Sequence, residues 1–593
     1  MVRPIPLLPD DVHPEHRMTS LAVPTDFTPQ IAPVADSVAI SALVALLPLL
    51  TIFVTLGALK WKAHWAGLTA VAVSIIVASL FFEMPVHLAA LAATEGAVFG
   101  LFPIMWIVFT AIVLYQVTVR SGHFEDLRAT FRLISDDPRI QAIIIAFCFG
   151  ALLEALAGFG APVAITGVML MAVGFAPLRA ATVVLLANTA PVAFGAIAIP
   201  ILTAGNLTGI PYQEIGAYVG HQAPVIAIFV PLLLVFMVDG RRGVRQTWPA
   251  AVVIGLAFAV TQWVSSTWIS VEMTDIIASL VALAVAVAFL RVWQPSGGDE
   301  ATESLQVERR EQLAAVGAGG GVADAGTVGE YQVTPEELDE QARALTPRSI
   351  AWAMFPYVLV VAVFSVAKLI PAVDDALTAT NIKIPWPGLA GEVLTHAGEP
   401  NGSATYSLTW LSSPGTMLLV CAVVVALAYG IGVSGLVAEM RETAVKMRWA
   451  FVTVSSVLAL AYVMNLSGQT ITIGAWIAGT GSAFAFLSPL LGWLGTAVTG
   501  SDTSANALFA TLQQSAAERA GIDPTLLVAA NTSGGVVGKM ISPQNLTIAA
   551  TAVGLVGQES AILRKVLPWS VGLIIVMCLL VGLQSTVLSG MLP

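Results

Sequence analysis

Long apolar blocks separated by short polar stretches make up most of the chain. Blocks of about 18–23 residues recur, the length that an α-helix needs to cross a hydrocarbon core roughly 30 Å thick. The segment VALLPLLTIFVTLGAL (44–59) is apolar on every face, whereas the strands of a membrane barrel alternate apolar with polar residues. Because only helices and closed barrels satisfy the backbone in lipid, the pattern predicts an all-α polytopic membrane protein.

The apolar blocks predict about 12–14 transmembrane helices. The regular candidate spans are 38–59, 65–82, 100–119, 140–157, 214–238, 249–268, 272–292, 349–370, 414–432, 450–465, 471–488 and 566–588. Three further regions, 86–100, 158–205 and 494–556, are apolar but are cut by Gly, Pro, Ser and Asn at intervals too short for uninterrupted spans.

Composition agrees with a membrane protein. Of 593 residues, 57% are hydrophobic and 11% are charged, whereas soluble domains contain about 25% charged residues. Much of the net charge of −11 comes from acidic residues of segment 293–348. The expected organisation is a polar N-terminal tail (1–36), a first transmembrane half (37–292), an acidic cytoplasmic loop (293–348) and a second transmembrane half (349–593).

Basic residues in short connections predict the orientation, because such connections favour the cytoplasm. If the connections that carry these basic residues lie in the cytoplasm, then 83–90, 269–271, 371–413 and both termini lie outside. The three cysteines lie far apart in apolar segments, so the sequence suggests neither disulfides nor a metal site. No cofactor is expected, nothing indicates nucleic-acid binding, and the chain is either a monomer or a homo-oligomer. The basic residues are Lys60, Lys62, Arg120, Arg128, Arg132, Arg139, Arg241, Arg242, Arg245, Arg441, Lys446, Arg448, Arg564 and Lys565.

Two of the irregular regions share a spacing that predicts an internal repeat. Gly158 precedes Asn188-Thr189 by 30 positions, and Gly500 precedes Asn531-Thr532 by 31 positions. In both regions a proline follows the asparagine after 12 positions, at Pro200 and Pro543. Paired interrupted segments in two halves of a membrane protein indicate the binding site of a secondary transporter. Backbone groups freed at membrane depth are tolerated where they line a cavity.

The first interruption, ALLEALAGFGAPVAITG (151–167), contains an acid within the apolar run. A carboxylate at the membrane centre costs roughly 2.5–3.5 kcal/mol on insertion scales, and burial favours its protonated form. Glu154 is therefore a candidate proton carrier beside a helix break at Gly158 and Gly160. The alternative is a carboxylate that faces an aqueous vestibule or bonds permanently to a neighbouring helix.

The second interruption gathers polar groups in GSDTSAN (500–506). Asp502 is a second candidate proton carrier, and Ser501 and Thr503 offer hydroxyl groups to a ligand. The alternative for all three is helix capping, which Ser, Thr and Asp favour. The two Asn-Thr pairs supply amides and hydroxyls to a substrate or, alternatively, hydrogen bonds between helices.

Lys539 and Ser467 complete the candidate site. Lys539, within GGVVGKMISPQ, is a partner for a substrate carboxylate; alternatively it neutralises Asp502 or extends to the membrane interface. Ser467 belongs to SGQT, which interrupts another apolar run and is expected to line the pathway. Sequence motifs of metalloproteases, serine hydrolases and ATP-driven pumps are missing, which disfavours those classes.

Four segments, LEALAGFGAPVAIT, ANTAPVAFGAIAIPIL, LGWLGTAVTGSDTSANALFATLQ and LLVAANTSGGVVGKMISPQ, resemble the signature segments of the L-lactate permease family. The resemblance extends from about residue 38 to the C-terminus and leaves out the tail 1–36 and the loop 293–348. It implies a multi-pass protein of the bacterial inner (plasma) membrane that takes up L-lactate, D-lactate or glycolate together with H⁺.

The two Asn-Thr pairs are also similar, more distantly, to those of carboxylate transporters built from inverted repeats. This likeness implies re-entrant hairpins near 158–176 and 500–520 and broken helices near 177–205 and 525–556. The expected substrate-binding residues are Gly158, Gly160, Asn188, Thr189, Ser501, Thr503, Asn531, Thr532, Ser467 and Lys539.

Either Asp502 or Glu154 is expected to carry the proton, with Asp502 favoured because hydroxyls surround it. Carrying a proton cancels the charge of a monocarboxylate anion, whose inward movement alone costs about 2.3 kcal/mol per 100 mV. Two alternatives remain. One is a sodium-coupled carboxylate symporter in which the Asn-Thr pairs hold Na⁺ with unwound carbonyls. The other is a membrane sensor whose loop 293–348 contacts a cytosolic partner.

Overall fold

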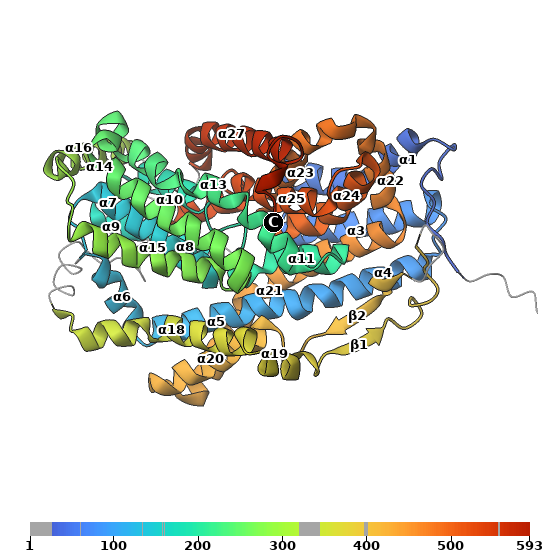
Figure 1. The fold of residues 1–593 in the computed structure, drawn as a ribbon, viewed down its shortest axis with the longest axis horizontal. Coiled ribbons are helices and arrows are strands. Elements are labelled where there is room, and N and C mark those ends of the chain that lie inside the picture. The colour runs from blue at the N-terminus through green and yellow to red at the C-terminus, as the bar shows by residue number, and fades with distance from the viewer. Residues whose placement is uncertain are drawn as a thin grey trace, which may run out of the picture.

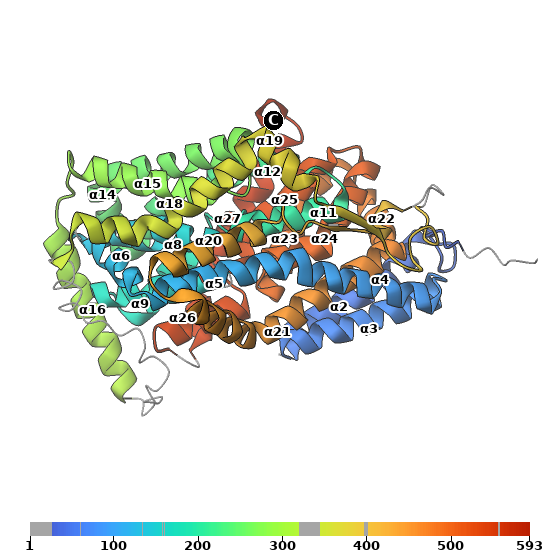
Figure 2. The ribbon, with the colours of Figure 1, turned by 90° about the horizontal axis from the view of Figure 1, so that it is seen from below.

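The computed structural model describes residues 26–59, 61–132, 134–156, 158, 160–318, 344–395, 401–555 and 558–593. Its helices run mostly along the long axis of the molecule (Figures 1 and 2). Within these residues, nine helical stretches are long and apolar enough to cross a membrane, and shorter apolar helices such as Thr274–Leu290 accompany them. The predicted all-helical polytopic architecture is confirmed.

The N-terminal helices and the long helix α21 form one packed group, in which α21 lies against α3, α4 and α5. Its members before residue 133 are α1 (Val38–Ala45), α2 (Leu47–Phe53), the π-helical turn η1 (Val54–Ala58), α3 (Ala63–Phe81), α4 (Val86–Phe99), the π-helical turn η2 (Gly100–Met105), α5 (Trp106–Arg120) and α6 (His123–Arg132).

The next helices carry the first interrupted region. They are α7 (Pro138–Ala142), the π-helical turn η3 (Ile143–Phe149), α8 (Gly150–Leu156), α9 (Ala161–Val173), α10 (Pro177–Ala187), the 3-10 turn η4 (Ala196–Ala198), α11 (Ile199–Thr208), α12 (Tyr212–Gly220) and α13 (Ala223–Ala227). Gly158 and Gly160, between α8 and α9, both have positive φ, and the chain leaves the helix after α10 until η4 begins.

A long bent helix and the end of the first half follow. These elements are α14 (Val230–Val264), the π-helical turn η5 (Ser265–Ile269), α15 (Thr274–Leu290) and α16 (Gly298–Ala318). Helix α14 bends at Asp239 and Gly240. Helix α16 lies within the predicted loop 293–348, whose composition had indicated only solvated chain. Its Glu308 pairs with Arg179 at the start of α10.

The second half begins with α18 (Pro347–Leu369) and α19 (Pro371–Thr378). A two-stranded antiparallel sheet, β1 (Ile382–Pro385) and β2 (Thr405–Leu408), pairs Ile382 with Leu408. The elements that follow are α20 (Pro414–Ala428), α21 (Gly432–Leu466), α22 (Gln469–Ile477), α23 (Phe484–Thr499), α24 (Asp502–Ala520), α25 (Pro524–Lys539), α26 (Pro543–Ala552) and α27 (Glu559–Gln584), with the 3-10 turns η7 (Gly402–Ala404), η8 (Ala478–Ala483) and η9 (Ser589–Met591).

Several of these helices begin at a local sequence signal, an Asp or Ser followed by Pro. Asp137, Ser413, Asp523 and Ser542 each cap a helix whose first residue is proline. The capping side chain accepts a hydrogen bond from a free amide of the first turn. The proline has no amide to leave unsatisfied there, and its fixed φ suits the helix. The sequence therefore sets these helix starts without help from distant residues.

The described end of the predicted tail is packed against the protein. The Phe27 amide donates to the Glu392 carbonyl at 2.7 Å, the Leu394 amide donates to the Phe27 carbonyl at 2.9 Å, and the Phe27 ring is buried. The Thr472 hydroxyl of α22 donates to the Ile31 carbonyl at 3.0 Å. Residues 26–36 thus join the segment after β1 to α22, whereas residues 1–25 of the predicted tail lie outside the described residues.

Candidate functional site

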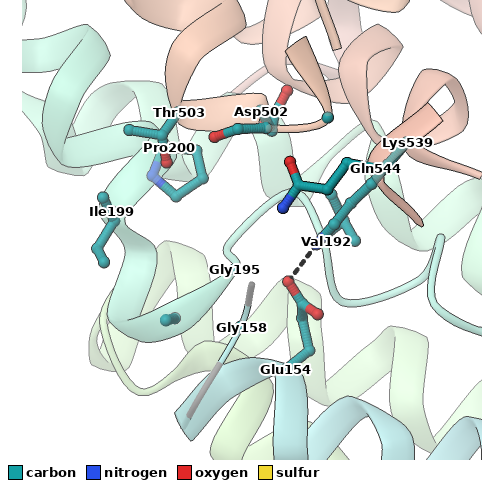
Figure 3. Close-up of a pocket in the computed structure, with 13 residues that line it drawn as sticks. Glu154, Gly158, Val192, Gly195, Ile199, Pro200, Asp502, Thr503, Lys539 and Gln544 are labelled. Atoms are coloured by element: carbon teal, nitrogen blue, oxygen red, sulfur yellow. Dashed lines mark hydrogen bonds and ion pairs between the residues drawn. The ribbon is translucent and has the colours of Figure 1, made fainter. Parts of the chain in front are cut away.

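The two interrupted regions meet at one small cavity of about 40 Å³. Figure 3 shows Gly158 and Glu154 on one side of it and Asp502 and Thr503 on the other. Its lining residues are Glu154, Gly158, Val192, Gly195, Ala196, Ile199, Pro200, Gly500, Ser501, Asp502, Thr503, Lys539 and Gln544. Segments more than 300 positions apart in the sequence therefore build a single site.

Several helices begin at this cavity. Ile199 and Pro200 start α11, Ser501 caps α24, and Gln544 is the second residue of α26. Gly158 leads into α9, whose first residue is Ala161. The start of a helix carries unpaired amides and a partial positive charge. Several helix starts at one cavity make it a favourable place for an anion.

A buried ion pair crosses the cavity. The Lys539 ammonium at the end of α25 donates to Glu154 Oε1 of α8 at 2.5 Å (Figure 3). Only 9% of the Lys539 side chain and 3% of the Glu154 side chain are exposed. The second carboxylate oxygen of Glu154 is buried without a hydrogen bond among the described residues. Lys539 is therefore near an acid of the protein and remains within reach of an anionic ligand in the same cavity.

Asp502 is the second buried acid of the cavity and is less well satisfied. Its Oδ1 accepts one hydrogen bond, from the Thr496 hydroxyl at 3.3 Å, and its buried Oδ2 has no partner among the described residues. An ionised carboxylate with an unpaired buried oxygen is costly, and protonation removes that cost. Asp502 therefore has the environment of an acid that gains or loses a proton with its surroundings.

The glycines of α25 explain how these groups come so close. A Cβ at Gly534 would lie 2.1 Å from the Pro489 carbonyl of α23, and one at Gly538 would lie 2.2 Å from the Trp493 carbonyl. A Cβ at Gly535 would lie 1.8 Å from Asp502 Oδ1. Small residues allow membrane helices to approach at backbone distance. The GGVVG motif thus brings α23, α24 and Lys539 together.

The break before α24 also requires glycine, which gives a first test. Gly500 has φ of +78°, and a Cβ there would lie 2.5 Å from Gln544 Oε1. We expect Gly500→Ala to cost about 1–2 kcal/mol from backbone strain alone and to lower substrate uptake further by displacing Gln544. Gly521→Ala is the matched control, because Gly521 has φ of +67° and open space around it. Equal uptake by the two variants would show that the Gln544 contact has no functional role.

Some of the predicted site residues line the cavity. Glu154, Gly158, Ser501, Asp502, Thr503 and Lys539 are among its lining residues. Gly160 does not line the cavity and lies against Ile548 of α26. The Ser501 hydroxyl also accepts the Ser504 amide at 3.3 Å, so it caps α24 as the alternative interpretation expected. Ser501 therefore both caps α24 and lines the cavity.

Asn531 and Thr532 lie outside the lining of this cavity. Both lie within the continuous helix α25 and are fully buried. The Asn531 amide donates to Asn506 Oδ1 at 2.8 Å, and the Thr532 hydroxyl donates to the same oxygen at 3.1 Å. Their polar atoms therefore join α25 to α24, which is the inter-helix bonding that was the alternative.

Asn188, Thr189 and Ser467 also lie outside the cavity lining. Asn188 follows the last residue of α10 and has a buried Oδ1 without a partner among the described residues, and the Thr189 hydroxyl donates to the Leu186 carbonyl at 2.6 Å. Ser467 ends α21 and accepts the Gln469 amide at 2.9 Å. The segment after Asn188 reaches the cavity instead through Val192, Gly195 and Ala196.

The sequence analysis missed Gln544, which lines the cavity, and Asn506, which joins helices that line it. Gln544 is one of the few uncharged polar side chains in the cavity and lies beside Lys539 in Figure 3. Asn506 donates to the Pro200 carbonyl at 3.1 Å and to the Thr532 hydroxyl at 2.8 Å, which ties α11 to α24 and α25. Gln544 lies in SPQ and Asn506 lies in GSDTSAN. A polar side chain within an apolar region was therefore the sequence signal that could have identified each residue.

A third buried acid lies just beyond the cavity. Asp275, at the start of α15, accepts the Gln262 amide at 2.8 Å, and the same amide donates to the Ala190 carbonyl at 3.2 Å. Asp275 Oδ2 is buried without a partner among the described residues. The Gln262 amide therefore links Asp275 to the unwound chain that follows α10. The sequence analysis did not single out Asp275, which follows an ordinary-looking polar turn.

Comparison with known proteins identifies the family of the chain. The family model for L-lactate permease matches residues 41–588. The chain belongs to the L-lactate permease family. The permease is 42% identical to "Glycolate permease GlcA" of Escherichia coli (strain K12), over 93% of the chain and 97% of that protein. It is 40% identical to "L-lactate permease" of Bacillus subtilis (strain 168), over 96% of the chain and 100% of that protein.

The family confirms the expected class of protein. This permease is a transporter rather than an enzyme and a multi-pass protein of a bacterial cell membrane. A solved YdaH transporter from Alcanivorax borkumensis is 16% identical and covers 81% of this chain and 84% of its own, with a TM-score of 0.39.

Proposed function

We propose that the permease is a proton-coupled symporter for L-lactate and related 2-hydroxymonocarboxylates, D-lactate and glycolate. Its family and its relatives support transport of lactate or glycolate. The observation that carries the proposal further is the cavity itself, where the cation Lys539 and the poorly satisfied acid Asp502 lie among several helix starts. A monocarboxylate needs a positive site, and proton coupling needs an acid that titrates.

The substrate carboxylate binds at the helix starts and at Lys539. The first turn of α24 and the start of α11 line the same cavity as the Lys539 ammonium, and the positive end of each helix dipole favours an anion there. Gln544 and Thr503 offer an amide and a hydroxyl for the remaining polar group of the substrate, the 2-hydroxyl. A site that hydrogen-bonds a hydroxyl discriminates strongly against analogues that lack it, because its polar groups are then left unpaired.

The proton binds at Asp502 and makes substrate binding favourable. An ionised Asp502 would repel the incoming carboxylate at short range in a low-dielectric cavity. Protonation removes that repulsion, so the proton and the anion bind together or poorly. Glu154, the other candidate, already accepts Lys539, and a substrate carboxylate at Lys539 competes with it. Glu154 therefore acts as the internal partner of Lys539 when the site holds no substrate.

The size of the cavity requires a movement during the cycle. A cavity of about 40 Å³ holds a few water molecules at roughly 10–15 Å³ each, but it is small for an acid of three carbons and three oxygens. Binding therefore separates the break at Gly158 from the break at Gly500, or opens the Lys539–Glu154 contact. Both changes enlarge the space between the same helix starts.

The coupling ion is tested by uptake into proteoliposomes. With an inward proton gradient and no sodium, we expect accumulation of lactate, whereas a sodium gradient at equal pH on both sides gives only equilibration. The position of Asn531 supports this, because its carbonyl belongs to the regular helix α25 and is not an unwound sodium ligand. Accumulation that follows sodium and ignores pH would identify the sodium-coupled alternative. Comparing L-lactate, D-lactate and glycolate in one preparation gives the substrate range.

A further inference from the structure

Helices α14, α15 and α16 lie together at one end of the molecule (Figure 2), and residues of α14 and of the segment after α15 line a basic cleft there. It is open and measures about 650 Å³, far larger than the transport cavity. Arg241, Arg242 and Arg245 form one side, and Trp293 and Ser296, just after α15, form another. The basic residues of this connection are those expected to lie in the cytoplasm. The cleft has no part in the transport mechanism described above.

The cleft has a rigid frame behind it. Arg139, at the start of α7, is fully buried and donates to the Gln246 side chain and to the Ser296 carbonyl at 2.7 Å. The same guanidinium pairs with Asp137 at 2.7 Å and with Asp239, at the bend of α14, at 3.1 Å. Since Gln246 and Ser296 both line the cleft, Arg139 fixes two of its walls relative to each other.

Two of the three arginines in the cleft are free to bind a ligand. Arg242 already pairs with Asp239 at 2.6 Å and with Glu300 of α16 at 3.4 Å. Arg241 and Arg245 are exposed and have no ion-pair partner in the described part of the chain. Guanidinium groups one helical turn apart bind phosphate oxygens through planar, paired donors. The charge of the cleft therefore suits a phosphate.

Apolar side chains beside the arginines indicate where that phosphate comes from. Trp248 is 54% exposed and lines the cleft, and Val292, adjacent to Trp293, is 87% exposed. Tryptophans are enriched at the boundary between membrane and water. A soluble anion would leave these apolar surfaces in water, whereas acyl chains beside a bound headgroup would cover them. Basic pockets between membrane helices on the cytoplasmic side are suited to anionic lipid headgroups.

We propose that this cleft binds the phosphate headgroup of an anionic phospholipid, with Arg241 and Arg245 on the phosphate and Trp248 and Trp293 against the lipid backbone. The lipid joins the bend of α14 to the end of α15. Because Arg139 links the same cleft to the start of α7, and α7 leads through η3 to Glu154 on α8, bound lipid steadies the element that carries one wall of the transport cavity.

The test measures phospholipid binding to the purified full-length permease in a neutral detergent. By native mass spectrometry, we expect phosphatidylglycerol to be retained in preference to phosphatidylcholine. R241A/R245A is expected to bind phosphatidylglycerol roughly 30-fold more weakly, and each single variant roughly 5-fold more weakly. R564A/K565A is the matched control, because it removes two exposed basic residues from another connection, and it is expected to bind like the wild type.

Thermal unfolding gives a second readout and identifies the source of the phosphate. Phosphatidylglycerol is expected to raise the midpoint Tm of the wild type and of R564A/K565A but not of R241A/R245A. Glycerol phosphate added to the permease in phosphatidylcholine is expected to leave Tm unchanged. An equal rise with glycerol phosphate would overturn the proposal in favour of a soluble phosphate ligand. Wild-type lipid retention by R241A/R245A would overturn it as well.

Discussion

Asp502→Asn is expected to abolish pH-gradient-driven lactate accumulation while lactate exchange across the membrane continues. One pH unit corresponds to 1.36 kcal/mol, so a symporter that carries one proton per anion accumulates lactate about tenfold for each unit. The asparagine variant, which cannot carry the proton, is expected to reach only equal concentrations. Its neutral side chain resembles protonated Asp502 in shape and charge, so the substrate still binds and exchanges.

Asp275→Asn is the matched control for this prediction. Asp275 is another fully buried acid with an unpaired Oδ2 among the described residues, but it does not line the cavity. It is expected to keep gradient-driven accumulation. Both variants are measured in the same proteoliposomes, by uptake under an imposed pH step and by counterflow of labelled lactate. Wild-type accumulation by Asp502→Asn would exclude Asp502 from the proton role, and Glu154→Gln in the same assay would then test the remaining candidate.

The sequence predicted the helical membrane class and the location of the breaks because both are local properties. Apolar length and the lack of alternation predict membrane helices wherever they occur. Gly158 and Gly500 mark breaks because a positive φ at each position favours glycine. The predicted ranges 158–176 and 500–520 contain the single helices α9 and α24, each preceded by its break. The inverted relation between the two regions remains a prediction.

The two Asn-Thr pairs differ for a reason that is visible in the sequence. Pro191 follows Asn188 by three positions, and a proline lacks an amide and clashes with the preceding turn. Helix α10 therefore ends before Asn188. The segment after Asn531 has no proline until Pro543, so α25 continues to Lys539. The two pairs therefore lie in different backbone environments, although their spacing predicted the same role for both.

Sequence analysis predicted neither the partner of Lys539 nor helix α16, and the reasons differ. Lys539 was expected to meet a substrate or Asp502 or to extend to the membrane interface, but it pairs with Glu154, because the packing of α8 near the end of α25 decides which acid is in reach. Such contacts between distant segments have no local signature. Helix α16 had a signal that composition concealed, since its Glu, Gln, Arg, Ala and Leu residues are good helix formers.

Variants of the Lys539–Glu154 pair are expected to have large effects on both stability and transport. Lys539→Met leaves the Glu154 carboxylate buried without its partner, and removing one member of a buried pair costs about 3–5 kcal/mol. Glu154→Gln leaves the ammonium in the same condition. We expect both single variants to unfold at lower temperature. Arg179→Met is the control, because the Arg179–Glu308 pair is 27% exposed on each side and exposed pairs contribute about 0–1 kcal/mol.

The double variant Glu154→Gln/Lys539→Met separates the structural from the functional role of this pair. Replacing both members with neutral groups of similar size is often neutral for stability, so its thermal midpoint is expected to return close to the wild type. Lactate binding, measured by calorimetry in detergent, is expected to be lost, because the cavity no longer has the only cation among its lining residues. Recovery of both stability and lactate binding would mean that Lys539 serves packing alone, and that the helix starts bind the carboxylate without it.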